Sequence, residues 1–359
     1  MNRQIIKTVA TTIAILMFCG TAVLAFQDKI SPVSDYQYKR DYAQFETLKK
    51  ETDPQKKGDL LIAYMKERSI SRMLPYVLAD YLETLKPLMA ANNWARVAAM
   101  EEAFRALMPT EKSVAAAQVP EPGAGEFIKN QLRPAHKLIE QSLLAAYFQS
   151  NNMAKAAEFA EQAHAENPAD KQMTQALLQI YAKSNQVDKY MGLAEKVVAE
   201  TPIEQSFGMA MQLADMNAQK GNLAKAVDYS SKVMQVYGDK VPQGVQESAW
   251  NNERAKAYGY MAASAYQAKD YPKAIELYEQ VSKYAPKSDS PYYYIGMSKW
   301  QSKDQEGAID YFAKAVVLGK DFSKKAQGYL EQLYKARHND SLDGLDQVLA
   351  KAKASLGIS

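Results

Sequence analysis

A unit of about 34 residues recurs along the C-terminal half of this 359-residue chain and restricts its fold more than any other feature. The segment "KDYPKAIELYEQVSKYAP" at residues 269–286 is followed 34 residues later by "KDQEGAIDYFAKAVVLGK". One column of the alignment runs back along the chain in steps of 34, 48, 36 and 34 residues and holds Ala308, Ala274, Ala226, Tyr190 and Ala156. Each copy contains two amphipathic segments joined by a short polar turn, and one such pair cannot bury its own apolar face. The repeats therefore predict an all-α array of stacked helix pairs.

This pattern resembles the tetratricopeptide repeat, a 34-residue helix-turn-helix unit, most clearly in "YGYMAASAYQAKDYPKAIELYEQVSKYAP" and "YYYIGMSKWQSKDQEGAIDYFAKAVVLGK". The resemblance implies a right-handed α-solenoid of antiparallel helix pairs, with five repeats in residues 128–322 and capping helices in residues 323–359. Tyr190 stands where a small residue is expected, and Lys299 stands where an aromatic residue is expected. We expect looser or differently angled helix contacts at these two positions.

Residues 26–109 also have a helical pattern. Asp53 followed by Pro54 is a typical helix start, and residues 78–109 look like one degenerate repeat. Residues 110–127 are rich in Pro, Gly and Ala and predict a linker or a domain boundary.

The 48-residue step between two repeats contains an insertion at residues 237–254 that includes Trp250. A long loop in a tight array is often functional. The alternative is an extended helix with Trp250 packed on its neighbour.

The first 25 residues have the composition of a targeting segment. Arg3 and Lys7 precede an apolar run over residues 8–25 that ends in small residues before Phe26, which is typical of a signal peptide. The alternative is a signal anchor, because a run of about 18 apolar residues approaches the length of a membrane span. We therefore expect export to the bacterial periplasm or cell envelope, with possible membrane anchoring through residues 8–25. Cys19, the only cysteine, lies in this run, so the remaining chain has no disulfide.

No sequence pattern points to catalysis, to a metal or to a cofactor. The three histidines have no metal-ligand spacing, and the chain has neither a Gly-rich nucleotide loop nor a nucleophile elbow. Glu101 and Glu102 would point about 100° apart on a helix, which predicts a solvated face rather than an acid–base pair. The net charge of +3 gives no support to nucleic-acid binding. An enzyme site in the N-terminal helical region is the weaker alternative to a protein without catalytic activity.

The tetratricopeptide resemblance implies a concave groove lined by the first helix of each pair. The implied partner-binding residues are rich in Gln at one end and in aromatic residues and Met at the other: Gln141, Gln175, Gln179, Tyr266, Tyr293, Met297 and Trp300. Aromatic residues and Met are enriched in interface cores. The alternative is that the aromatic residues pack against the C-terminal helices. The run of tyrosines at 292–294 predicts that at least one faces solvent or a partner, because three successive helix positions fan across about 200°.

These features together predict a non-enzymatic scaffold or adaptor that binds a protein or peptide ligand through its concave face. The alternative is a membrane-anchored assembly factor for an envelope complex. The two hypotheses differ only in the fate of residues 1–25.

Overall fold

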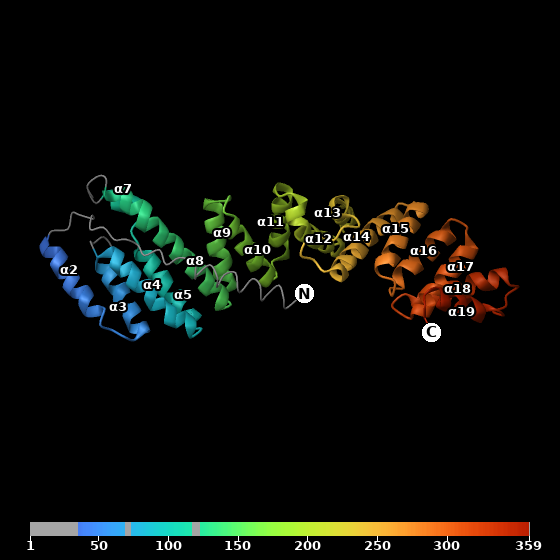
Figure 1. Cartoon of the computed structure of the whole chain (residues 1–359), viewed down its shortest axis with the longest axis horizontal. Helices are drawn as coiled ribbons and strands as arrows, with labels where there is room; N and C mark the ends of the chain where they lie inside the picture. Colours follow the sequence, from blue (N-terminus) through green and yellow to red (C-terminus); the bar gives the residue numbers. More distant parts are fainter. Residues whose placement is uncertain (1–34, 69–72, 117–122, 359) are drawn as a thin grey trace. The chain divides into compact units, whose positions relative to one another are not determined.

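The computed structural model describes residues 35–68, 73–116 and 123–358. All regular secondary structure in these ranges is helical, which confirms the all-α prediction (Figure 1). The chain forms two compact units, Met1–Val187 and Asp188–Ser359. The predicted leader at residues 1–25 lies outside the described residues. Within the described ranges, no helix combines the length and the apolar character that crossing a bilayer requires.

The first unit is built from helices that pack on their neighbours along the chain. They are α2 (Asp35–Leu48), α3 (Pro54–Glu67), α4 (Leu74–Ala90), α5 (Trp94–Leu107), α6 (Glu111–Ala116), α7 (Gly123–Phe127), the π-helical turn η1 (Ile128–Leu132), α8 (Arg133–Gln149), α9 (Met153–Glu166) and α10 (Lys171–Lys183). The predicted start of α3 is confirmed, because the Asp53 carboxylate accepts hydrogen bonds from the backbone N–H groups of Gln55 and Lys56, both at 2.9 Å. The segment predicted as a degenerate repeat folds as α4 and α5.

Two short helices, α6 and α7, lie in the segment predicted as a linker, residues 110–127. Pro120 and Pro122 of this segment fall outside the described residues. The division between the compact units comes at Val187, inside the predicted repeat array, and not at this segment. The reason is that α8 packs directly on α5, so helix packing continues across the Pro- and Gly-rich stretch.

A single type of turn joins the two helices of each pair. A residue in the left-handed region, with φ between 55° and 78°, follows the first helix at Asn92, Asn151, Asn185, Gly221, Lys269 and Lys303. In all six turns the next N–H bonds to the carbonyl five residues earlier, at 2.8 to 2.9 Å. This is the Schellman arrangement, which satisfies carbonyl groups that a helix end leaves unpaired. The short polar turns predicted between paired helices therefore share one backbone geometry, and the α4–α5 pair shares it too.

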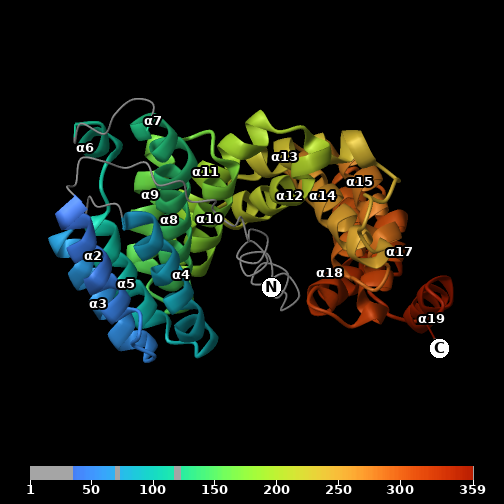
Figure 2. The same ribbon diagram turned by 60° about the vertical axis from the view of Figure 1, so that its left-hand side comes forward.

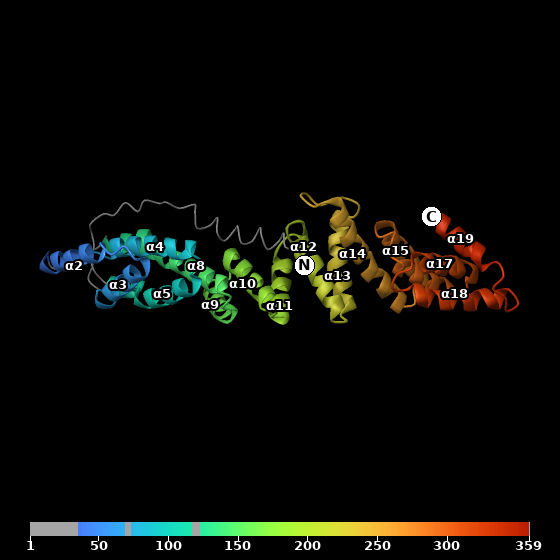
Figure 3. The same cartoon turned by 90° about the horizontal axis from the view of Figure 1, so that it is seen from below.

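The second unit contains the clearest repeats. Its helices are α11 (Val187–Glu200), α12 (Ile203–Gln219), α13 (Leu223–Tyr237), α14 (Glu247–Gln267), α15 (Tyr271–Tyr284), α16 (Ser290–Gln301), α17 (Gln305–Leu318), α18 (Ser323–Arg337) and α19 (Leu345–Ser355). Figures 2 and 3 show α12 beside α13 and α14 beside α15, Figure 1 shows α16 beside α17, and each of these pairs is in contact. The short turns make the helices of each pair antiparallel, as the tetratricopeptide resemblance implies.

The predicted column of small residues lies where paired helices approach most closely. Ala226, Ala274 and Ala308 are fully buried. Gly296 on α16 lies at a similarly close crossing, because a Cβ atom added to it would lie 2.8 Å from the ring of Phe312 on α17. Small residues at these positions therefore allow the paired helices to approach closely.

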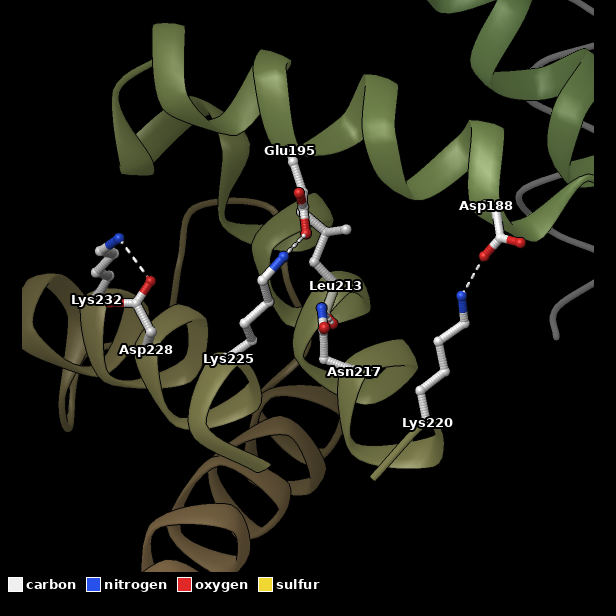
Figure 4. Close-up of polar contacts among 8 residues, drawn as sticks. All are labelled: Asp188, Glu195, Leu213, Asn217, Lys220, Lys225, Asp228 and Lys232. Carbon is white, nitrogen blue, oxygen red and sulfur yellow. Dashed lines mark hydrogen bonds and ion pairs between the residues drawn. The ribbon is translucent and has the colours of Figure 1, made fainter. Parts of the chain in front are cut away.

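Polar contacts connect α11 to the pair α12–α13 (Figure 4). Asp188 on α11 forms an ion pair with Lys220, and Glu195 forms one with Lys225 at 2.9 Å. The large residue Tyr190 is buried in the small-residue column, and its hydroxyl donates a hydrogen bond to Gln212 on α12 at 2.7 Å. A tyrosine is therefore accommodated at this crossing with its polar atom satisfied.

The second part of the insertion at residues 237–254 forms about the first two turns of α14, which begins at Glu247. Trp250 is fully buried there, with its ring 6.1 Å from that of Phe207 and 5.7 Å from that of Tyr237. Arg254 anchors the preceding loop, because its Nε donates to the Gly238 carbonyl at 3.0 Å. Of the two interpretations of the insertion, the extended helix with a packed Trp250 is the one observed.

The C-terminal helices cover the end of the second unit, as predicted. Leu330 and Leu333 on α18 join Leu345 and Ala352 on α19 in one buried cluster with the apolar face of α17. Terminal helices of this kind shield the last apolar face of a repeat array from water.

The expectation for Glu101 is wrong. Glu101 is fully buried in the first unit, where the Ser142 hydroxyl on α8 donates a hydrogen bond to it at 2.6 Å. Its neighbour Glu102 is partly exposed and accepts hydrogen bonds from the Tyr147 hydroxyl at 2.7 Å and from Lys155 at 2.6 Å. The adjacent carboxyl groups do point in different directions, but α8 covers one of them.

Candidate protein-binding surface

The second unit carries a partly exposed aromatic surface on the first helices of its last pairs. We define the aromatic surface as Tyr266 on α14, Tyr294, Met297 and Trp300 on α16, Phe322 at the start of α18, and Tyr329 on α18. All six side chains are half-buried. Three of the predicted binding residues, Tyr266, Met297 and Trp300, belong to it, whereas Tyr294, Phe322 and Tyr329 were not predicted.

Ring contacts hold the aromatic surface together across three helices. The ring of Tyr294 lies 5.7 Å from that of Tyr266 and 5.5 Å from that of Phe322, and the ring of Trp300 lies 5.2 Å from that of Tyr329. These tilted and edge-on pairs each contribute about 0.5–1.5 kcal/mol beyond the area they bury. Burial raises the pKa of Tyr266, so its hydroxyl is neutral at physiological pH and can both donate and accept a hydrogen bond.

Tyr293 is a core residue and not a surface residue, which corrects its predicted role. It is 8% exposed, and its ring lies 5.0 Å from Phe322, 6.0 Å from Phe312 and 6.2 Å from Tyr329. Burial raises its pKa to about 12. The alternative that the aromatic residues pack against the C-terminal helices therefore holds for Tyr293, while Tyr294 is the tyrosine of the run that keeps some exposure.

Asp289 fixes the position of α18 relative to α16, and sequence reasoning missed it. Its buried carboxylate accepts hydrogen bonds from the backbone N–H groups of Phe322 at 2.7 Å and Ser323 at 2.9 Å, at the start of α18. An anionic acceptor at a helix N-terminus is favourable, because the first N–H groups have no partner within the helix. Asp289 thereby sets the places of Phe322 and Tyr329 in the aromatic surface. In the sequence, an Asp before the Ser-Pro start of α16 carries no local sign of its contact with residues 33 and 34 positions further along the chain.

The three predicted glutamines belong to the first unit, whereas the predicted aromatic residues belong to the second. Gln141 on α8 and Gln175 on α10 are exposed. Gln179 on α10 is half-buried, and its Oε1 has no hydrogen-bond partner among the described residues. The partner-binding role of these glutamines stays a prediction.

The histidines make local contacts. His136 Nε2 lies 3.0 Å from the Pro109 carbonyl oxygen, and the ring of His338 stacks on Tyr334 at 3.8 Å. Across residues 35–68, 73–116 and 123–358, no three His, Cys, Asp or Glu side chains are grouped to hold a metal ion.

Comparisons with known proteins give only loose similarities. No family model matches the sequence, and no curated protein matches it. Among solved structures, "MamA MSR-1 C2" aligns at 18% identity and a TM-score of 0.34, covering 55% of this chain and 97% of that one. A tetratricopeptide repeat protein from Parabacteroides merdae aligns at 13% identity and a TM-score of 0.30, covering 71% and 98%. The TPR2AB domain of yeast Sti1, in a structure titled as a complex with pHSP90, aligns at 13% identity and a TM-score of 0.29, covering 89% and 100%. These scores are too low to carry an argument about function, so the candidate surface rests on the contacts within this chain.

Proposed function

We propose that the protein is a non-enzymatic scaffold or adaptor that binds a protein or peptide partner through the aromatic surface of its second unit. The observation that carries this proposal is the set of half-buried Tyr, Trp, Phe and Met side chains on three successive first helices. Other apolar side chains of this unit are half-buried as well, but these six lie together on neighbouring first helices, and each of the five aromatic rings among them contacts another ring of the set.

The chemistry of the aromatic surface suits a protein partner. Tyr and Trp offer a large apolar area together with a polar group, and Met adapts its shape to its neighbour. Such side chains dominate the binding energy of many protein interfaces. The surface is also preorganised, because ring contacts and Asp289 already hold its members in place, and this reduces the entropy lost on binding.

We also propose that the protein acts outside the cytoplasm, in the bacterial periplasm or cell envelope. This part rests on the composition of residues 1–25. Sequencing the N-terminus of the native protein tests it: a start at Phe26 supports a released scaffold, and an intact leader supports the membrane-anchored assembly factor. A cytoplasmic protein with an intact N-terminus would contradict both.

The binding proposal is tested by affinity capture with three forms of the protein: wild type, the double variant Tyr266→Ala/Trp300→Ala, and the control Val236→Ala. Val236 is an exposed apolar residue on α13, a second helix of a pair, outside the aromatic surface. Circular dichroism checks that all forms are folded. We expect wild type and control to retain a partner that the double variant loses. Recovery of the same partner with all three forms would contradict the proposed surface.

A further inference from the structure

Glu101 is a buried carboxyl group at the contact of α5 with α8 in the first unit. Its side chain is fully buried, and the Ser142 hydroxyl on α8 donates to Oε1 at 2.6 Å. The other oxygen, Oε2, is buried and has no hydrogen-bond partner among the described residues. A buried carboxylate is strongly unfavourable unless cations and several donors surround it. The single donor observed suits the neutral, protonated form.

The charged groups around this contact form ion pairs with residues other than Glu101, although the buried Nε of Arg96 has no hydrogen-bond partner among the described residues. On α5, Arg96 pairs with Asp59 of α3, Arg105 lies 4.0 Å from Glu140 of α8, and Glu102 pairs with Lys155 of α9. On α3, Lys57 pairs with Asp80 of α4 at 3.2 Å.

From α4, Tyr81 faces Glu101 with a buried hydroxyl that has no partner among the described residues. Its ring stacks on Phe104 of α5 at 3.7 Å, which fixes it in this core. No described cation therefore compensates a negative charge on Glu101.

We propose that Glu101 is a proton-dependent latch: its neutral carboxyl group keeps the contact of α5 with α4 and α8 closed, and this contact opens more readily as the pH rises toward 8. The physical basis is linkage. When the helices separate, water reaches Glu101 and the group ionises at its ordinary pKa, whereas in the closed state burial raises its pKa to about 8.

The sign follows from the two pKa values. A group whose pKa is raised in the closed state stabilises that state fully only at a pH below its pKa in the open state, about 4.5. Above that pH, the equilibrium constant for opening the contact grows about tenfold per pH unit. It levels off above the closed-state pKa of about 8. Between pH 6 and pH 8 the expected increase is about fiftyfold.

Native-state hydrogen exchange of the full chain at pH 6, 7 and 8 tests the latch. Exchange rates are corrected for base catalysis and compared for peptides of α5 and α8 in wild type, Glu101→Gln and Glu102→Gln. Gln is neutral at every pH and can still accept from Ser142. We expect the opening equilibrium to rise about fiftyfold in wild type and in Glu102→Gln, and to stay flat in Glu101→Gln. Equal pH dependence in wild type and Glu101→Gln would overturn the proposal.

A second measurement does not depend on a folded variant. Carboxyl NMR of wild type with labelled glutamate follows the titration of Glu101 directly, and the signal is assigned by its loss in Glu101→Gln or, if that variant does not fold, by its contact with Ser142. A titration midpoint well above 6 supports the latch. A midpoint near 4.5 refutes it.

Discussion

The close crossing of α16 and α17 makes Gly296→Ala the sharpest test of the helix packing. A Cβ atom at Gly296 would lie 2.8 Å from Cδ1 and 2.9 Å from Cε1 of Phe312. The Phe312 ring is fully buried and lies 6.0 Å from the ring of Tyr293 and 5.6 Å from that of Tyr329, so it cannot move aside freely. Overpacking of this kind costs about 1–3 kcal/mol.

A second effect of the substitution has the opposite sign. Ala is favoured over Gly in a helix interior by about 1 kcal/mol. Gly208 on α12 is a matched control for this effect, because it is exposed and a Cβ added there would meet nothing within 4 Å. We therefore expect Gly208→Ala to stabilise the second unit by up to about 1 kcal/mol. The free energies of unfolding of Gly296→Ala and Gly208→Ala should differ by the overpacking cost alone, about 1–3 kcal/mol.

The measurement is urea unfolding followed by tryptophan fluorescence in a Trp94→Phe background. The chain has 3 tryptophans, and removing Trp94 leaves Trp250 and Trp300, which both belong to the second unit. The unfolding midpoint should fall for Gly296→Ala and rise for Gly208→Ala, with unchanged slopes. If both substitutions stabilise equally, α16 and α17 do not cross closely at Gly296, and the packing role of this small residue is refuted.

Three further substitutions, one of them with a matched control, have defined outcomes in urea unfolding followed by tryptophan fluorescence. Asp289→Ala should lower the free energy of unfolding of the second unit by about 1–3 kcal/mol, because it leaves two backbone N–H groups at the start of α18 without their acceptor. An unchanged free energy of unfolding would exclude the role of Asp289 in placing α18. Trp250→Ala, followed through Trp300, should cost about 3–5 kcal/mol, whereas the exposed Val236→Ala should change stability by less than about 0.5 kcal/mol. The Glu101→Gln test uses a chain that keeps Trp94, whose fluorescence reports on the first unit. Between pH 5 and pH 8 this variant should gain stability relative to wild type by up to about 4 kcal/mol, and a pH-independent difference would contradict the buried neutral carboxyl group.

The sequence was informative about features that depend on residues close together in the chain, or on a role that recurs in every repeat. Asp53 was identified as a helix cap and Ala274 as a packing residue from their positions in the sequence, and both assignments are confirmed. A cap acts through the backbone two or three residues away, and a small residue in a repeat column has the same role in every copy. Such features need no knowledge of which distant helix lies opposite.

The candidate surface was less predictable, because exposure depends on which helix covers each position. Tyr293 and Tyr294 are adjacent and chemically identical, yet their directions differ by about 100°, and α18 buries only the first of them. Tyr329 and Phe322 join the surface only because Asp289 binds the start of α18. No local pattern in the sequence indicates that long-range contact.

The sequence by itself determined the all-α class, the helix pairs, their turns and the small-residue columns, because each follows from periodicity and local backbone chemistry. Only the tertiary structure decided that Glu101 is buried, that Trp250 is a core residue, that Tyr294 and not Tyr293 keeps exposure, and that the compact units divide at Val187. The physical reason is the same in each case. Burial is a property of two surfaces in contact, and the second surface comes from residues far away in the sequence.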